Sequence, residues 1–249
     1  MDKAQRLYNE LSWIWELWGD PKTEYALFSS YLYKNLQAIA RKKIESILVL
    51  GCGGGKNVFT LKTHAHTTGL DLSPDMLKLA RKLNPGCDFV LADMRTFDLG
   101  KTYDAIVVDD AVSYMLSEDD LTALFASCYK HLEPNGVLSV GPDICKENFV
   151  QNRCDVFHSI SHPDYPGTQI VYITNDYDPN PEDNTYETSF IYLIRQNGKL
   201  TIETDLHTLG IFKTETWSRL LIKNGFSITE STYSAEEGEY QTYFCSREA

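Results

Sequence analysis

The residues with the clearest chemical potential lie in the stretch ILVLGCGGGKNV, residues 47–58. Glycines follow an apolar run at positions 51, 53, 54 and 55, where they let the backbone turn sharply and approach a ligand closely. The stretch is not a phosphate-binding P-loop, because Lys56 is followed by Asn57 rather than Ser or Thr. It is not a GxGxxG dinucleotide fingerprint either, since Lys56 replaces the last glycine. A GxGxG turn remains, and a strand–helix turn without a ligand is the alternative.

An acidic residue ends the next apolar run, TTGLDL. Asp71 stands twenty residues after Gly51, and an acid there can accept two hydrogen bonds from ribose hydroxyls. The alternative is a charge at the start of a helix that Ser73 caps and Pro74 opens.

A second acid follows in LADMRTF. Asp93 can accept a hydrogen bond from an adenine amino group, and the backbone N–H of Met94 can donate to the ring. Met76 and Met94 are suited to pack on purine faces, although each alone is more typical of an ordinary core.

The elements that must position these residues alternate between strands and helices. Strands are predicted at 46–50, 67–72, 88–92, 105–109 and 136–140, and helices at 3–18, 23–42, 56–63, 74–83 and 118–132. This order predicts a parallel sheet with helices on both faces. From about residue 145 the pattern changes to antiparallel strands at 168–176, 184–196 and 199–209, with Asn197-Gly198 as a hairpin turn. A helix at 214–223 and strands at 226–233 and 240–246 close the chain.

Composition narrows the function. The 249 residues are 43% hydrophobic, enough for one sizeable core, and the net charge of −12 argues against nucleic acid as a partner. Six scattered cysteines without a CxxC pair indicate reduced thiols and a cytoplasmic location. No apolar run is long enough to span a membrane, and the first residues do not resemble a signal peptide.

The glycine turn, the acid at Asp71 and the Asp93-Met94 pair resemble, in this order, the class I S-adenosylmethionine-dependent methyltransferases. The segments YDAIVVDDAVSYML and LEPNGVLSV extend the resemblance, which covers about residues 46–142 and the closing strands. It implies an α/β fold: a Rossmann-like, mostly parallel seven-stranded sheet with a small antiparallel β lid inserted after strand five. Residues 1–144 and 211–249 would form the cofactor-binding domain with its N-terminal substrate-side helices, and 145–210 the lid.

The resemblance also implies a cofactor, S-adenosylmethionine, and residues that hold it. Backbone groups at the glycine turn would hold the methionine end, Asp71 would take the ribose, and further residues would surround the adenine or lie near the amino acid moiety. The full set is Gly51, Cys52, Gly53, Asp71, Leu72, Met76, Asp93, Met94, Asp109 and Asp110. The family usually has an acid two residues before the first glycine, where this chain has Val49. Asp109 or Asp110 is expected to compensate.

The catalytic candidates come from the same resemblance. Amino-sugar and glycine N-methyltransferases begin with a similar helix whose tyrosine reaches the reacting centre, which makes Tyr8 a candidate. Tyr114 follows strand four, and His207 lies on the last lid strand. For Trp13 and Trp15, packing of the N-terminal segment onto the sheet is the favoured interpretation, because residues two apart cannot share a helix face.

We therefore predict an enzyme that transfers a methyl group from S-adenosylmethionine to a small-molecule acceptor, with an amine nitrogen favoured, and that forms a homodimer. The alternatives are an O-methyltransferase for a carboxylate or hydroxyl, a non-catalytic cofactor-binding module and, last, a nicotinamide oxidoreductase. No metal is expected, although Cys154, His158 and His162 would share one face if that segment were helical.

Overall fold

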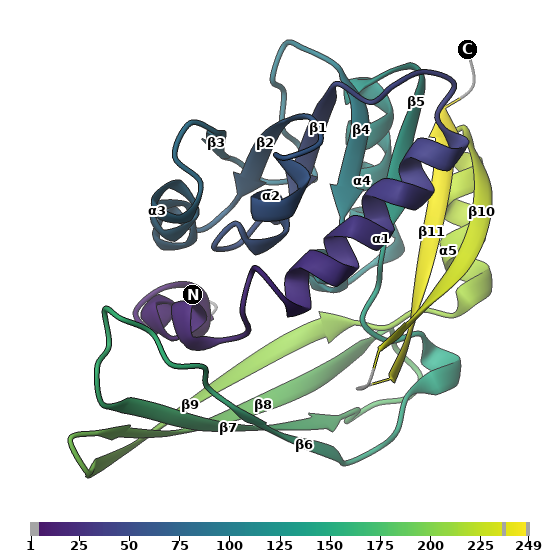
Figure 1. Ribbon diagram of the computed structural model, residues 1–249. Coiled ribbons are helices and arrows are strands. Elements are labelled where there is room, and N and C mark those ends of the chain that lie inside the picture. The colour runs from purple at the N-terminus through teal and green to yellow at the C-terminus, as the bar shows by residue number, and fades with distance from the viewer. Residues whose placement is uncertain (1–4, 236–237, 248–249) are drawn as a thin grey trace.

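A seven-stranded sheet forms the centre of the computed structural model, which describes residues 5–235 and 238–247 (Figure 1). Its strand order is β10-β11-β5-β4-β1-β2-β3, and every pairing is parallel except those of β11 with β5 and β10. The strands are β1 Ser46–Leu50, β2 His66–Asp71, β3 Asp88–Leu91, β4 Tyr103–Val108, β5 Leu132–Val140, β10 Phe226–Ala235 and β11 Gly238–Arg247. The predicted mostly parallel sheet is confirmed.

Helices cover both faces of this sheet, because its strands are apolar on both sides. One core packs Leu48, Ile106 and Leu138 against α4 and α5, and the other packs Ile47, Val107 and Val137 against α1, α2 and α3. The helices are α1 Glu24–Ile39, α2 Lys56–Leu61, α3 Pro74–Leu83, α4 Glu118–His131 and α5 Thr214–Lys223, with short 3₁₀ turns η3 Asp110–Tyr114 and η4 Lys146–Asn148. Within the described ranges no helix is long and apolar enough to cross a membrane.

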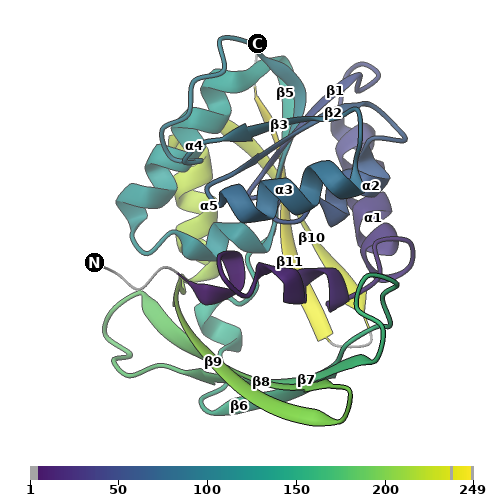
Figure 2. The same ribbon diagram turned by 90° about the vertical axis from the view of Figure 1, so that its left-hand side faces the viewer.

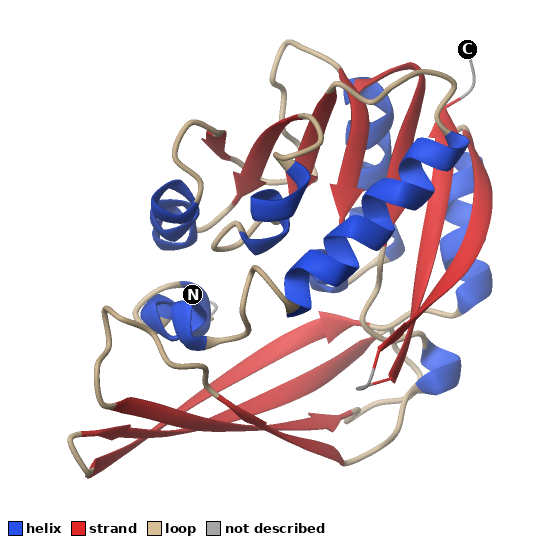
Figure 3. Cartoon of the chain, viewed as in Figure 1, coloured by secondary structure: helices blue, strands red, loops and turns tan. Residues whose placement is uncertain are grey.

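A separate antiparallel sheet of four strands lies below the carboxyl ends of β1 and β4 (Figures 1 and 3). Its order is β6-β7-β8-β9, with β6 Arg153–His158, β7 Thr168–Tyr177, β8 Thr185–Gln196 and β9 Lys199–Gly210. We call this sheet the lid. The close approach of Gly210 ties it to the main domain, since a Cβ there would lie 1.9 Å from the backbone oxygen of Met115.

The N-terminal segment runs between the lid and the main sheet (Figure 2). The helix predicted at 3–18 is wrong: the described part forms two 3₁₀ turns, η1 Arg6–Tyr8 and η2 Ser12–Leu17. This segment buries side chains on two sides at once, so it has no single apolar stripe of the kind a packed α-helix needs. Leu7 and Leu17 are buried with lid residues Tyr172 and Tyr192, whereas Trp15 lies on the glycine turn.

Candidate active site

The glycine turn lies where the strand order reverses, between β1 and β4. Ligands of open α/β sheets bind at this point, outside the carboxyl ends of the strands. Gly51 has φ +60°, and a Cβ there would lie 2.2 Å from the Cβ of Ala111, so only glycine fits. Gly54 is equally constrained, because a Cβ would lie 2.3 Å from the Trp15 ring. The turn is therefore shaped for close approach, with Trp15 resting on it.

Asp71 stands beside this turn at the end of β2. Its carboxylate accepts hydrogen bonds from the backbone N–H of Gly53 at 2.7 Å and of Ser73 at 2.8 Å. Burial raises the pKa of Asp71, although hydrogen bonds from the backbone of Ser73, Gly53 and Leu72 oppose the shift. Leu72 next to it is 68% exposed, which is unusual for a large apolar side chain. Ser73 also caps α3, as the alternative interpretation of this stretch predicts.

The other predicted cofactor residues differ in how they are placed. The carboxylate of Asp93 is held by Arg95, whose guanidinium nitrogens lie 2.7–3.2 Å from it, and a carboxylate paired in this way can still accept a further hydrogen bond. Met94 is half-buried and packs against the core beside α4. Met76 has no exposed surface, and the prediction that it contacts a purine is wrong, because α3 buries it inside the protein. Cys52 is buried in the core and can contribute only backbone groups.

Three carboxylates gather at the ends of β4 and β5: Asp109, Asp110 and Asp143. Burial and the neighbouring carboxylates raise the pKa of Asp109 and Asp143 well above the ordinary value, and burial raises that of Asp110. Asn57 donates to Asp109 at 3.1 Å, but no described lysine or arginine forms an ion pair with any of the three. Asp110 keeps an exposed side chain, and Asp71, Asp110 and Asp143 act electrostatically on Tyr8. We call the space between these carboxylates and Tyr8 the acidic space. Val49 is buried in the core, and Asp109 and Asp110 directly follow the neighbouring strand β4.

The three predicted catalytic side chains come together on one side of this space. The hydroxyl oxygens of Tyr8 and Tyr114 are 2.7 Å apart, and the Tyr114 hydroxyl lies 2.8 Å from Nδ1 of His207. They come from η1, η3 and β9, three elements far apart in the sequence. Ser73 donates to the backbone oxygen of Tyr8, which links this chain to the turn that holds Asp71. Burial is the largest cause that raises the pKa of both phenols, so they are protonated at neutral pH.

Asp205 extends the chain and was not predicted. Its Oδ2 lies 2.9 Å from Nε2 of His207, which is 1% exposed. The available signal was alternation, since residues two apart on a strand share a face. Asp143 was also missed, although it follows the Gly-Pro pair that ends strand five.

Lys56, the residue after the glycines, is directed toward the N-terminal segment. It is buried, its Nζ donates to the backbone oxygen of Gly19 at 3.0 Å, and it lies over the rings of Trp15 and Tyr25. Burial lowers its pKa to about 7, against the attraction of Glu24, Asp20 and Glu16. Its role is to fasten the segment before α1 onto the glycine turn.

The metal site considered for Cys154, His158 and His162 would need a helix, but Cys154 and His158 lie on strand β6. His162 instead lies in a loop with Glu16 and Asp164, near enough for one ion. The ammonium of Lys82 occupies that position, 2.6 Å from each carboxylate. This group therefore joins α3, η2 and the lid through a lysine.

Comparison with known proteins agrees with this geometry. Residues 47–136 match the family described as "Methyltransferase domain". A dTDP-3-amino-3,4,6-trideoxy-alpha-D-glucopyranose N,N-dimethyltransferase from Streptomyces venezuelae is 41% identical over 108 residues, which cover 42% of this chain and 45% of the relative. A dTDP-3-amino-3,6-dideoxy-alpha-D-glucopyranose N,N-dimethyltransferase from Streptomyces fradiae is 26% identical over 78% of this chain and 76% of its own.

A solved structure extends the likeness to the lid. CalS10, an amino pentose methyltransferase from Micromonospora echinaspora, superimposes with a TM-score of 0.81 over 96% of this chain and 97% of its own, at 22% identity. The sheet order, the glycine turn and the matched domain are similar to those of the class I S-adenosylmethionine-dependent methyltransferases. Within that class, its similarity is to the amino-sugar N-methyltransferases. The aligned segment is a little under half of the first relative's length.

Proposed function

We propose that this protein transfers a methyl group from S-adenosylmethionine to the nitrogen of a small-molecule amine. The observation that carries the proposal is the chain of Tyr8, Tyr114 and His207, which begins at the acidic space. One side of that space offers negative charge for cations, and the other offers oxygen and nitrogen atoms that can accept a proton.

The residues around the glycine turn fit the cofactor. Asp71 offers acceptor oxygens where a ribose diol would lie, and Leu72 exposes an apolar side chain that an adenine would cover. Asp109, Asp110 and Asp143 suit the sulfonium and the ammonium of the cofactor, because no described lysine or arginine neutralises them. When bound, S-adenosylmethionine supplies an activated methyl group with a good leaving group.

The chain's own residues must then bind the amine and remove its proton. An alkyl amine is mostly protonated near neutral pH, and only the neutral form has a lone pair for attack. The acid cluster would attract the cation, and Tyr8 would orient it and accept its proton. The lid and the N-terminal segment would exclude water and hold the nucleophile close to the methyl group.

The acceptor class follows from the comparisons. Both relatives described above are named for dTDP-linked amino sugars, so an amino sugar is the first acceptor to test. O-methylation of a carboxylate is the second candidate. The acidic space argues against it, since like charges there would repel an anionic acceptor.

The remaining expectations are proposals of the same kind. We infer that residues 145–210 act as the substrate lid on the domain formed by 1–144 and 211–249, and that the enzyme is cytoplasmic, in keeping with six free cysteines. We also infer a homodimer without nucleic acid. The outer face of the lid exposes aliphatic side chains, which a second copy would cover: Val156, Ile191, Ile202 and Leu206.

An acceptor panel tests the proposal. The purified protein is incubated with S-adenosylmethionine and dTDP-amino sugars, free amines, hydroxy acids or dicarboxylates, and products are detected by mass spectrometry. Turnover of an amine should rise from about pH 6 to about pH 9 as the neutral base becomes populated. Tyr8→Phe, Tyr114→Phe and His207→Gln should lower turnover while cofactor binding is retained. Methylation of hydroxyl or carboxylate acceptors alone, or tighter binding of NADH than of S-adenosylmethionine, would refute it.

A further inference from the structure

The chain of polar contacts that begins at Tyr8 ends at Asp205, which accepts from two partners with one oxygen. Oδ2 of Asp205 lies 2.9 Å from Nε2 of His207 and accepts from the backbone N–H of Leu7 at 2.8 Å. Burial alone would raise the pKa of Asp205, but the hydrogen bonds from His207 and from the backbone of Leu7 and Arg6 outweigh it and the pKa is lowered. Asp205 is therefore an anion at neutral pH, and an anionic carboxylate only accepts hydrogen bonds.

This fixed acceptor gives the chain a direction. Nε2 of His207 must carry a hydrogen to donate to Asp205, so Nδ1 of the neutral ring is a lone pair. The Tyr114 hydroxyl must then donate to Nδ1, and its oxygen is left to accept from the Tyr8 hydroxyl. The oxygen of Tyr8 keeps its lone pairs for a further donor. The hydrogen-bond chain thus presents an acceptor, the Tyr8 oxygen, at the end opposite Asp205.

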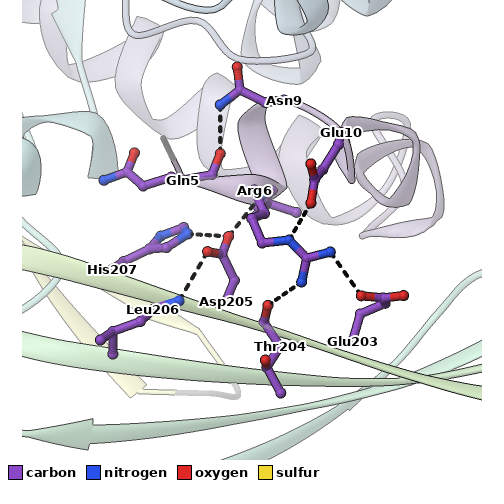
Figure 4. A network of polar contacts seen from close by, with 10 residues as sticks. Gln5, Arg6, Asn9, Glu10, Glu203, Thr204, Asp205, Leu206 and His207 are labelled. Carbon is purple, nitrogen blue, oxygen red and sulfur yellow. Dashed lines mark hydrogen bonds and ion pairs between the residues drawn. The ribbon is translucent and has the colours of Figure 1, made fainter. Parts of the chain in front are cut away.

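The same carboxylate also depends on how the N-terminal segment is seated. Leu7 directly precedes Tyr8, and Arg6 binds Glu203 at 2.8 Å and the backbone oxygen of Thr204 at 2.7 Å (Figure 4). Glu10 on the same segment also pairs with Arg6. Docking of η1 on β9 therefore positions Tyr8, the first member of the chain of polar contacts. It also brings the backbone N–H of Leu7 to Asp205, the last member.

Building on the proposed amine methylation, we propose that Asp205 is a positioning residue that directs a proton path from the acceptor's nitrogen to His207, and that seating of Arg6–Tyr8 on β9 completes this path. The N–H bond of the ammonium breaks and the proton forms a new O–H bond at Tyr8. The former Tyr8 proton moves to the Tyr114 oxygen, and the former Tyr114 proton moves to Nδ1 of His207. The imidazolium that results lies next to the Asp205 carboxylate, and no group is oxidised or reduced.

A spectroscopic test reads the direction without any substrate. Two-bond ¹H–¹⁵N spectra of the full chain distinguish the two neutral tautomers, and His207→Gln identifies the signals of His207. The wild type should show the Nε2–H form. Asp205→Asn, which keeps the shape but removes the charge, should convert His207 to a mixture. An Nδ1–H form in the wild type would overturn the proposal.

Kinetics then measure the consequence. Asp205→Asn should lower kcat about 10- to 100-fold, because general-base steps of this kind contribute about that much or more. KM for the amine and Kd for S-adenosylmethionine should change less than about threefold, since the Asp205 side chain is only 5% exposed and reaches the site through His207. Glu187→Gln, on the neighbouring strand β8, is the matched control and should leave kcat unchanged.

A second variant keeps the proposal open to refutation if Asp205→Asn does not fold. Arg6→Ala should lower kcat by loosening Tyr8 while the Nε2–H signal of His207 persists. Unchanged kcat in Arg6→Ala, or in a folded Asp205→Asn, would overturn the proton path and leave the acid cluster as the base. If no amine is turned over at all, the proposed function fails, and the tautomer spectra still decide whether Asp205 orients His207.

Discussion

At the scale of single residues, Asp71 combines two demands in one carboxylate. It holds the backbone amides of Gly53 and Ser73, and it is the acceptor proposed for the ribose. Asp71→Ala removes both, so the dissociation constant for S-adenosylmethionine should rise about 10- to 1000-fold in calorimetry, which is roughly 1.4–4 kcal/mol. Asp75→Ala, an exposed acid in the first turn of α3, should bind normally. Unchanged affinity in Asp71→Ala would remove Asp71 from the site.

The acid cluster of Asp109, Asp110 and Asp143 should lower the free energy of unfolding at neutral pH. Burial and neighbouring carboxylates raise the pKa of Asp143, so the folded chain binds this proton more tightly than the unfolded chain does. The stabilising contribution is complete at low pH and is lost as the pH rises through the raised pKa. Asp143→Asn should therefore increase the melting temperature above pH 7, by about 2–4 °C for each 1 kcal/mol gained, and have little effect near pH 4.

A residue with the opposite shift serves as the control for this prediction. The Lys130 ammonium, helped by the Gly100 backbone, lowers the pKa of Asp98. Asp98→Asn should therefore lose stability, not gain it, as the pH rises above 4. A melting temperature of Asp143→Asn that follows the wild type at every pH would show that the cluster is not strained.

At the scale of elements, the sequence predicted strands best and the N-terminal segment worst. Strands β1 and β4 are short, mostly apolar runs flanked by charged residues or glycine, so their pattern is local and readable. The segment at 5–18 takes its shape from the two surfaces that enclose it, and no local pattern encodes those. The Trp13 ring contacts the Tyr165 ring in a tilted arrangement, while Trp15 lies on the glycine turn. The two tryptophans, two residues apart, therefore point to opposite sides of the segment. Strand β6 was missed because its outward residues are polar or exposed.

The contact between α2 and the segment before α1 depends on a buried lysine. Burial lowers the pKa of Lys56 from 10.5 to about 7. Between these values the unfolded chain holds a proton that the folded chain has released, so the contribution of Lys56 to stability rises with pH. In denaturant titrations, the free energy of unfolding of the wild type should increase relative to that of Lys56→Met between pH 7 and pH 10. Lys78→Met, on the exposed face of α3, should show no such trend. Parallel curves for wild type and Lys56→Met would contradict the prediction.

At the scale of the whole molecule, alternation of strands and helices predicted the sheet, and the resemblance predicted what the sheet holds. The convergence of Tyr8, Tyr114 and His207 could be anticipated only as separate positions, because their contacts span 106 and 93 residues of chain. The role of Asp205 could not be anticipated at all, since it depends on a hydrogen bond from the backbone amide of Leu7, 198 residues away.

The outer face of the lid bears on assembly. Ile202 is 57% exposed on β9, and Ile173 and Ile191 pair beside it on β7 and β8. If a second copy covers this face, Ile202→Lys should convert the protein from dimer to monomer in light scattering, because an unpaired charge in an apolar interface is costly. Thr232→Lys, on β10 of the main sheet, is the control and should leave the mass unchanged. A wild-type monomer would refute the dimer.

The enclosed N-terminal segment also bears on the order in which the molecule assembles. During synthesis Arg6 leaves the ribosome long before Glu203, its partner 197 residues later, has been made. The part of the chain that is made first therefore cannot take its final place until the lid exists, and contacts so far apart in sequence form slowly. Until then Trp13, Trp15 and Trp18 stand open to other chains, a state prone to aggregation. The fluorescence of these three tryptophans during refolding would thus report the last closure, whereas Trp217 in the main core would report the earlier collapse.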